Sequence, residues 1–411
     1  MRWTLRSAAA TCVAVALSIP RPAGPAPAPA PDDSAARSIY FPRPINAEDT
    51  TLAGRRRRAR ETFEHALTLE RGHEPAAAIA TYRAATRIDP AVPEANYRMG
   101  MLFLTVNQLR PAAECFVQEI LHHPDHREAS RQLGLTYARL GDSQRAILQL
   151  EPLTRHHPRD AESLAALGFA YIAAKRTAAA DSALRRAIAL GPSRATWHRD
   201  LGTVLAAEGH TPEARREYAH AQRLDPRDPT PWINLANLER REGRHEAALT
   251  AYREAEVRDS LSPLALEGQV ETLRDLKRDR DAAAVYRRWL RRRPDDHHAR
   301  LDAVRLWDDL GRTDMALEIA RDGVRADPDS PDARLVLGMA LQSNGDWRGG
   351  LAELRHAERA FVRPEDQARV RAMIGSIRGI APDSLREFFA ADSVAHAESP
   401  TSAPSRPAGA R

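Results

Sequence analysis

The chain is poor in cysteine, in aromatic residues and in long apolar runs. It has only two cysteines, Cys12 and Cys115, among 411 residues, which excludes a disulfide scaffold and a cysteine-rich zinc site. After the N-terminus no apolar run reaches the length of about 18 residues that a transmembrane helix needs, so a polytopic membrane protein is excluded. Hydrophobic residues nevertheless make up 43% of the chain, which is enough for a sizeable core.

Lysine is almost absent, since 59 of the 61 basic residues are arginine. The formal net charge is +5, but arginines are interleaved with aspartate and glutamate along most of the chain, which is typical of surface ion pairs. Nucleic-acid binding would require a one-sided basic stripe with stacking aromatic residues. The two short basic runs, at 55–58 and 287–293, do not make such a stripe, so we expect no nucleic-acid partner.

The N-terminal segment, residues 1–22, has the pattern of an export signal. Arg2 and Arg6 precede an apolar stretch from Ala8 to Ile19, which is too short to span a bilayer and is followed by residues suited to cleavage. We therefore expect a periplasmic or secreted bacterial protein, or a cytoplasmic one if this leader is not a true signal. Cys12 raises the alternative of a lipoprotein, although the apolar run before it is short.

The two ends of the chain differ in composition from its middle. Removal of residues 1–22 leaves 58 basic against 56 acidic residues, so the net charge falls to +2 and Cys115 has no partner for an intramolecular disulfide. Residues 23–52 are rich in proline and alanine, which favours an extended linker without a packed core. Residues 393–411 are rich in serine, proline and alanine, which predicts a disordered tail.

The middle of the chain, residues 59–364, repeats with a period of 34 residues. A small residue, an alanine, a bulky residue and a proline recur at fixed places in the period, without insertion or deletion. Self-similarity at such a period is the signature of a stacked repeat architecture rather than of separate globular domains. The nine units are 59–92, 93–126, 127–160, 161–194, 195–228, 229–262, 263–296, 297–330 and 331–364.

Each period has the residue pattern of a helical hairpin. In the third unit Leu133, Gly134 and Tyr137 belong to the first helix, Ala146 to the second, and Pro158 ends the unit. The small residue and the alanine allow close approach of the two helices, and proline ends a helix because it has no N–H. This pattern resembles the tetratricopeptide repeat family over about three quarters of the chain. The resemblance implies an all-α, right-handed superhelical solenoid of nine antiparallel helix pairs.

Some positions depart from the pattern or close it. Val270 and Val304 replace the small residue in units seven and eight, and Ala320 replaces the bulky residue in unit eight, so packing there should be looser or shifted. Residues 365–392 are expected to form a capping helix over the last apolar face, followed by a short helix. Glycines at five of the turns within units are expected to adopt left-handed helix caps. These glycines are Gly141, Gly209, Gly243, Gly311 and Gly345.

No motif for catalysis or metal binding is found in the sequence. The His-Glu pairs at 73–74 and 245–246 lack the second histidine that a zinc protease needs. There is no phosphate-binding glycine loop and no nucleophile elbow. Histidine pairs at 122–123 and 156–157 occupy the same place in adjacent units and raise a shared metal site, but solvent-exposed histidines are the simpler interpretation. We expect no enzyme activity, no cofactor and no metal.

The resemblance also implies where a partner binds, because first helices line the concave groove in this family. An apolar strip suits the hydrophobic anchors of a peptide, and asparagine and arginine can bind a peptide backbone or a carboxylate. The alternative is that the apolar side chains only pack against adjacent repeats. The predicted groove has an apolar zone (Tyr97, Met101, Leu104, Leu135, Phe169 and Ile172), a polar zone (Arg199, Asn234, Asn237, Arg240 and Arg241) and an acidic zone (Glu267, Glu271, Asp302, Asp308 and Asp309).

The repeat array and the leader together predict a non-catalytic protein–protein interaction scaffold. It would bind a peptide segment in the groove during envelope assembly or secretion, without a stable membrane span and with peripheral association to an envelope complex. The alternative is a polysaccharide-binding scaffold of a cell-envelope polymer-export machine, although few tryptophans fall at groove positions. The identity of the partner does not follow from the fold, because such arrays share a scaffold and differ in groove chemistry.

Overall fold

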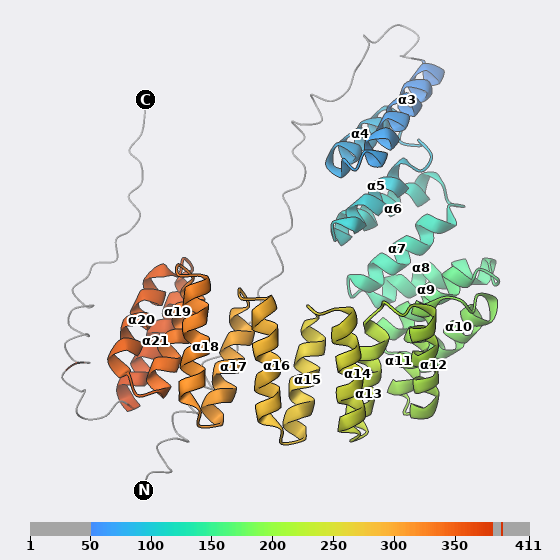
Figure 1. Cartoon of the computed structure of the whole chain (residues 1–411). Helices are drawn as coiled ribbons and strands as arrows, with labels where there is room; N and C mark the ends of the chain where they lie inside the picture. Colours follow the sequence, from blue (N-terminus) through green and yellow to red (C-terminus); the bar gives the residue numbers. More distant parts are fainter. Residues whose placement is uncertain (1–50, 381–387, 389–411) are drawn as a thin grey trace, which may run out of the picture. The chain divides into compact units, whose positions relative to one another are not determined.

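The computed structural model describes residues 51–380 and residue 388, and every regular element in these residues is an α-helix. Nineteen helices, α3 to α21, follow one another as nine antiparallel pairs and a final single helix, so the predicted all-α solenoid is confirmed (Figure 1). The helices form two compact units that divide between Arg258 and Asp259. The 34-residue period continues unbroken across this division, so the sequence pattern did not predict it.

The first unit contains six helix pairs, each of which is one repeat. From α7 onward, the first helices of neighbouring repeats contact one another, as α7 does α9 and α11 does α13. Among the described helices, second helices of neighbouring repeats do not pack as closely, so the first helices make the inner face and the second helices the outer face. The pairs are α3 (Leu52–Arg71) and α4 (Pro75–Ile88), α5 (Ala95–Thr105) and α6 (Leu109–His122), α7 (Arg127–Arg139) and α8 (Ser143–His156), α9 (Ala161–Ala173) and α10 (Thr177–Leu190), α11 (Ala195–Ala207) and α12 (Thr211–Leu224), α13 (Thr230–Arg241) and α14 (His245–Arg258).

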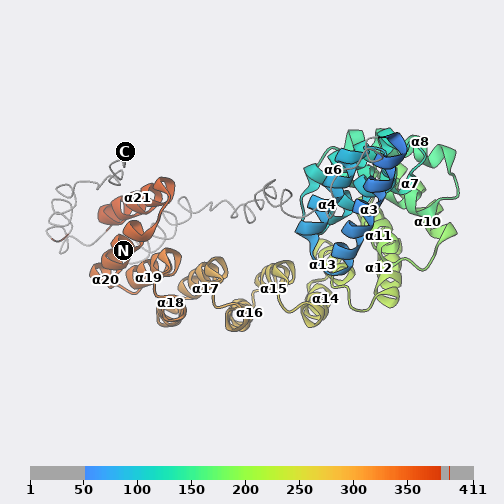
Figure 2. The same cartoon turned by 90° about the horizontal axis from the view of Figure 1, so that it is seen from above.

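The second unit contains three helix pairs and the last helix. Figure 2 views its helices nearly end-on, with the first helices α15, α17 and α19 in one row and the second helices α16 and α18 in another. Here too a first helix, α17, contacts the next first helix, α19. The elements are α15 (Pro263–Asp275) and α16 (Asp279–Arg292), α17 (His297–Asp309) and α18 (Thr313–Ala326), α19 (Pro331–Ser343) and α20 (Trp347–Ala360), and α21 (Pro364–Ile380).

Helix ends follow the 34-residue period. Second helices such as α4 and α6 end two residues before the recurring proline, at Ile88 before Pro90 and at His122 before Pro124. Each turn between the two helices of a repeat contains one residue with a positive φ, between 56° and 89°. The five predicted glycine caps are confirmed, and four other residues adopt the same conformation. These four residues are His73, Asn107, Lys175 and Lys277.

A small residue on the first helix faces a large residue on the second helix in most repeats. A Cβ atom added to Gly100 would lie 2.7 Å from the Phe116 ring, and one added to Gly202 would lie 2.7 Å from the Tyr218 ring. Both large side chains are fully buried. The glycines therefore allow the ring of the second helix to rest directly on the backbone of the first, as the sequence pattern predicted.

The seventh and eighth repeats have different residues at these two positions and pack differently. In the eighth repeat the large and small residues exchange places, since Val304 of α17 and Ala320 of α18 are both buried. In the seventh repeat Val270 and Tyr286 are both large, and Tyr286 is only half-buried, whereas the tyrosines at the same place in other repeats are buried. The predicted shift is thus seen in the seventh repeat, while the eighth compensates.

Helix α21 covers the end of the array. Its apolar side chains Val370, Met373 and Ile377 are buried, and it packs against α20. This confirms the predicted capping helix. The short helix expected after it lies outside the described residues apart from Phe388, whose ring lies 5.0 Å from the Arg348 guanidinium of α20. The leader 1–22 and the predicted tail 393–411 also lie outside the described residues, as does all of the linker 23–52 except its last two residues.

Candidate peptide-binding face

The apolar zone lies on the first helices α5, α7 and α9, and all six side chains are half-buried. Each packs on one side against a cluster of fully buried side chains in the first unit. One cluster is contacted by Tyr97, Met101 and Leu104, a second by Leu135 and Phe169, and a third by Ile172.

Packing against repeats therefore accounts for part of the burial of the apolar zone, as the alternative interpretation held. Tyr97 shows how this works. Its ring centroid lies 4.8 Å from that of His126 and 6.0 Å from that of Phe116, and burial raises the pKa of its phenol. The structure thus fixes the orientation of these side chains and leaves part of each one accessible. Binding to them stays a prediction.

The polar zone lies on α11 and α13, and most of its side chains already have partners within the protein. Arg199 forms ion pairs with Asp200, at 2.8 Å, and with Asp228, at 3.7 Å. The Asn234 amide donates a hydrogen bond to the Thr203 hydroxyl across the repeat boundary. Asn237, Arg240 and Arg241 complete the zone.

Two members of the polar zone remain well placed for a partner. Asn237 is exposed on α13, and its side-chain carbonyl oxygen accepts a hydrogen bond from the Tyr252 hydroxyl. This hydrogen bond fixes the orientation of the amide, so the direction of its NH₂ group is fixed as well. Arg241 is exposed and makes no ion pair with the described residues. An oriented amide donor beside a guanidinium is suited to a peptide carbonyl or a carboxylate.

The acidic zone lies on α15 and α17 in the second unit. Glu267, Glu271 and Asp302 surround the half-buried Tyr286 phenol, and burial together with these carboxylates raises its pKa. Burial also raises the pKa of Asp302, and it raises that of Asp308 to about 6. A surface of this charge attracts cations at neutral pH. Binding of a basic stretch to it stays a prediction.

Charge is distributed unevenly between the two units. Residues 52–258 hold 31 basic and 26 acidic side chains, a net charge of +5, whereas residues 259–380 hold 22 of each. The basic excess therefore persists in the first unit after the leader is set aside, a property that the net charge of the whole chain conceals.

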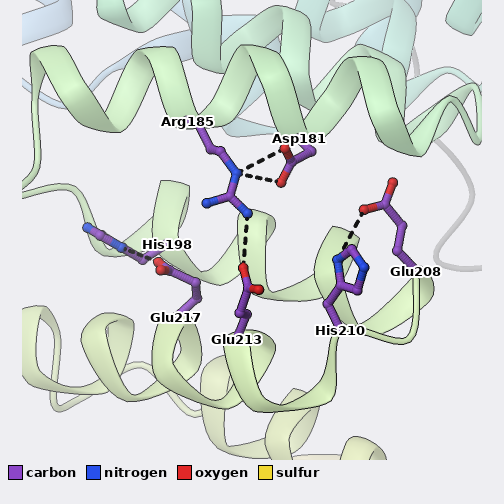
Figure 3. Close-up of polar contacts among 7 residues, drawn as sticks. All are labelled: Asp181, Arg185, His198, Glu208, His210, Glu213 and Glu217. Carbon is purple, nitrogen blue, oxygen red and sulfur yellow. Dashed lines mark hydrogen bonds and ion pairs between the residues drawn. The ribbon is translucent and has the colours of Figure 1, made fainter.

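Polar contacts on the outer face connect successive repeats. Figure 3 shows Arg185 of α10 between Asp181 on its own helix, at 2.9 Å, and Glu213 of α12, at 3.2 Å. In the same region His198 of α11 lies 2.7 Å from Glu217 of α12. The Arg185–Glu213 contact joins the fourth and fifth repeats, whereas the His198–Glu217 contact joins the two helices of the fifth repeat. Neither contact forms an evident catalytic arrangement.

An outer hollow of about 610 Å³, which the sequence analysis missed, lies between α4, α5 and α6. Its floor is apolar and its rim is polar, and it lies toward the second helices, away from the apolar zone. A neighbouring hollow of about 480 Å³ continues from it between α6, α7 and α8. The outer hollow is lined by Arg83, Asn96, Met99, Phe103, Gln108, Pro111, Glu114, Cys115 and Gln118.

Comparison of equivalent positions explains this hollow. His198 and Arg334, which take the place of Asn96 in the fifth and ninth repeats, each contact the carbonyl oxygen six residues earlier and a glutamate nineteen residues later. In the second repeat the corresponding pair is Asn96 and Cys115, which are too short for either contact. The 34-residue register contained this signal, because it aligns Asn96 with the longer side chains.

Catalytic and metal-binding arrangements are not evident in the described residues. No group of three or more histidine, cysteine, aspartate or glutamate side chains is placed to hold a metal in residues 51–380. His122 and His156 are exposed, whereas the ring of His126 caps α7 by accepting a hydrogen bond from Ala129 N–H. Burial raises the pKa of the Cys115 thiol to about 12, so it is a poor nucleophile. In the described part of the chain, no helix is both long and apolar enough to cross a membrane.

A scan against protein-family models matches the tetratricopeptide repeat in six overlapping segments. They run from 97–151 to 268–331 and together span residues 97–331, more than half of the chain. The chain belongs to the tetratricopeptide repeat family. Members of this family are in general non-catalytic scaffolds for protein–protein interaction, and the tetratricopeptide repeats of this chain indicate a protein partner.

Several solved structures are similar in fold to this chain. A tetratricopeptide repeat protein from Parabacteroides merdae shares 16% identity over 57% of this chain and 92% of its own, with a TM-score of 0.49. The protein TTC0263 from Thermus thermophilus shares 24% identity over 44% of this chain and 98% of its own, with a TM-score of 0.40. PilW, a type IV pilus biogenesis factor, shares 16% identity over 50% of this chain and 96% of its own, with a TM-score of 0.45. A search of curated proteins finds no match.

Proposed function

We propose that this tetratricopeptide repeat protein is a non-catalytic adaptor that binds a peptide segment of a protein partner on its inner face. The observation that carries the proposal is the apolar zone, whose six side chains are half-buried on three successive first helices. Because each is held by the core beneath it, little side-chain entropy is lost on binding. Partly exposed apolar side chains in a row are suited to the hydrophobic anchors of an extended or helical peptide.

The polar zone supports the same function. Asn237 and Arg241 extend the inner face beyond the apolar zone within the first unit, and both are exposed. They supply hydrogen bonds that orient a peptide, whereas the apolar zone supplies burial. A partner whose segment carries apolar anchors next to a carboxylate fits both zones.

We also propose that the protein acts outside the cytoplasm, in envelope assembly or secretion. The support is the sequence of residues 1–22, which has the pattern of an export signal and lies outside the described residues. The test is mass spectrometry of the N-terminus of the protein recovered from its native cells. A mature chain that begins near residue 23 is expected, and an intact Met1 in the cytoplasmic fraction would contradict export.

The alternative, a polysaccharide-binding scaffold, depends on exposed aromatic platforms. Trp197, Trp289 and Trp307 are buried, and Trp232 and Trp347 are half-buried. No tryptophan in the described residues is thus available as a flat, exposed sugar platform. The structure gives this alternative less support than peptide binding, and a glycan array would separate the two.

Co-purification with a variant pair tests the adaptor function. The double variant Tyr97→Glu/Phe169→Glu places two charges in the apolar zone and is expected to lose at least nine tenths of the partner recovered by the wild type. The matched control Leu121→Glu/Leu148→Glu places the same charges at exposed leucines of the outer face, on α6 and α8.

Thermal unfolding of both variants shows whether either one is unfolded, since Tyr97 and Phe169 also pack against the core. If Tyr97→Glu/Phe169→Glu loses helicity, Ile172→Glu takes its place. Equal recovery of partners by the folded apolar-zone variant and the wild type would show that the inner face does not bind the partner.

A further inference from the structure

We propose that the outer hollow is a second docking site, and that residues Ile39–Phe41 of the same chain occupy it. The inference goes beyond the adaptor function, because the hollow lies toward the second helices, away from the apolar zone. It rests on an amide that opens into the hollow, an apolar floor, a rim carboxylate and the reach of the N-terminal segment.

Asn96 is the first observation. Its side chain is only 6% exposed, it lines the outer hollow, and no hydrogen bond reaches its amide among the described residues. The polar atoms of the amide open into the hollow, where a ligand can reach them. The carboxamide offers both a donor and an acceptor, so a peptide bond, with its N–H and C=O, matches it.

The floor of the outer hollow is the second observation. Met99, Phe103, Pro111 and Cys115 line it around Asn96. Its volume of about 610 Å³ lies within the range of about 300–1,000 Å³ that is typical of ligand pockets. An apolar floor with one amide selects an apolar or aromatic side chain attached to a peptide backbone.

The N-terminal segment supplies such a peptide. Between the predicted leader and α3, the large apolar residues are Ile39, Tyr40, Phe41 and Ile45, and the rest is mostly proline, alanine and polar residues. Phe41 precedes Thr51 by ten residues, which span up to about 35 Å when extended. Thr51 is the N-cap of α3, and the outer hollow lies along α5, the first helix of the next repeat, which is about 16 Å long. The segment can therefore reach the hollow.

Charge complementarity favours this occupant. Glu114 is exposed on the rim of the hollow and forms no ion pair with the described residues. Arg37 and Arg43 flank Ile39–Phe41 closely, whereas the nearest acidic residues, Asp33 and Glu48, are eight positions before and seven after Phe41. With Phe41 in the hollow, the Arg43 guanidinium is within reach of the Glu114 carboxylate.

Photo-crosslinking in the full chain tests the proposal. We would replace Phe41 by p-benzoylphenylalanine, irradiate the protein and map adducts by mass spectrometry. The expected result is an adduct within one chain to peptides of α5 or α6. The same replacement at Ala28, in the same proline-rich segment, is the control and is expected to give no such adduct.

Two variants add a second readout. Asn96→Ala is expected to lower the yield of the adduct at least fivefold, and Glu114→Arg, on the exposed rim where folding is not at risk, at least twofold. Adducts to other helices, adducts between two chains, or no adduct above the Ala28 control would overturn the proposal. An unchanged yield in both variants would overturn it as well.

Discussion

At the scale of single residues, one residue in each turn within a repeat adopts the same left-handed backbone conformation. All nine turns have a residue with positive φ, spaced by 34, but only five of these residues are glycine. L-residues other than glycine pay about 1–2 kcal/mol for the left-handed conformation, because Cβ approaches the following carbonyl oxygen. The only two lysines of the chain, Lys175 and Lys277, occupy this position.

Replacement of these lysines by glycine should stabilise the protein. Lys175→Gly and Lys277→Gly relieve the left-handed strain, and part of this gain is offset by the greater freedom of glycine in the unfolded chain. We expect each to raise the free energy of unfolding by about 0.5–1 kcal/mol, measured by urea denaturation. Gly141→Ala is the matched opposite, expected to lose about 1 kcal/mol. A destabilised Lys175→Gly would show that the lysine side chain has a role of its own.

Asp308 makes the stability of the second unit depend on pH. Burial raises its pKa from 3.8 to about 6 in the folded protein, so the folded state binds more protons than the unfolded state between these values. Stability therefore falls as pH rises through this window. Because solvent screens this partly exposed carboxylate, we expect Asp308→Asn to gain about 1–2 kcal/mol relative to the wild type between pH 4 and pH 7, measured by denaturation at each pH. A difference that is constant with pH would contradict the raised pKa.

At the scale of helix pairs, the eighth repeat shows how several positions change together. Arg300 of α17 is 2% exposed, and its guanidinium donates to the carbonyl oxygens of Ile319 and Pro294. Gly323 makes room for it, because a Cβ there would lie 2.5 Å from the Arg300 Nε atom. Most other repeats have alanine at this position. The glycine and the arginine therefore form one packing solution.

Gly323→Ala tests this coupling. The added methyl group should push the buried guanidinium from its carbonyl partners and lower the free energy of unfolding by about 1–3 kcal/mol. In an Arg300→Leu background the same change should cost much less, which a double-mutant cycle from urea denaturation measures as a coupling energy. Additive effects of the two substitutions would show that Gly323 is not needed to make room for Arg300.

Much of the arrangement of the helix pairs was predictable from the sequence. The 34-residue period placed the nine helix pairs and the glycine caps, because each recurring residue type has one local physical role. The apolar residues that follow the ninth unit placed the capping helix. The period did not reveal that Val304 and Ala320 compensate each other, since this depends on which side chains meet in space. It also did not show that the residues of the apolar zone share their surfaces with the cores beneath them.

At the scale of the whole molecule, two features escaped sequence analysis. The array divides into two compact units after Arg258, although the repeat continues without interruption. The outer hollow arises because a short amide and a thiol stand where other repeats have long polar side chains, which becomes visible only when the register is combined with the packing. Candidate binding residues were placed on first helices correctly, but their partners within the protein were not foreseeable from spacing.

The most direct test of the central claim, peptide binding by the inner face, is photo-crosslinking to the partner in its native cells. We would place p-benzoylphenylalanine at Ile172 of α9, in the apolar zone, and in a second protein at Leu148 of α8, on the outer face. We expect a discrete adduct with a partner from Ile172 and none from Leu148. An adduct from Leu148 alone, or from neither position, would contradict it.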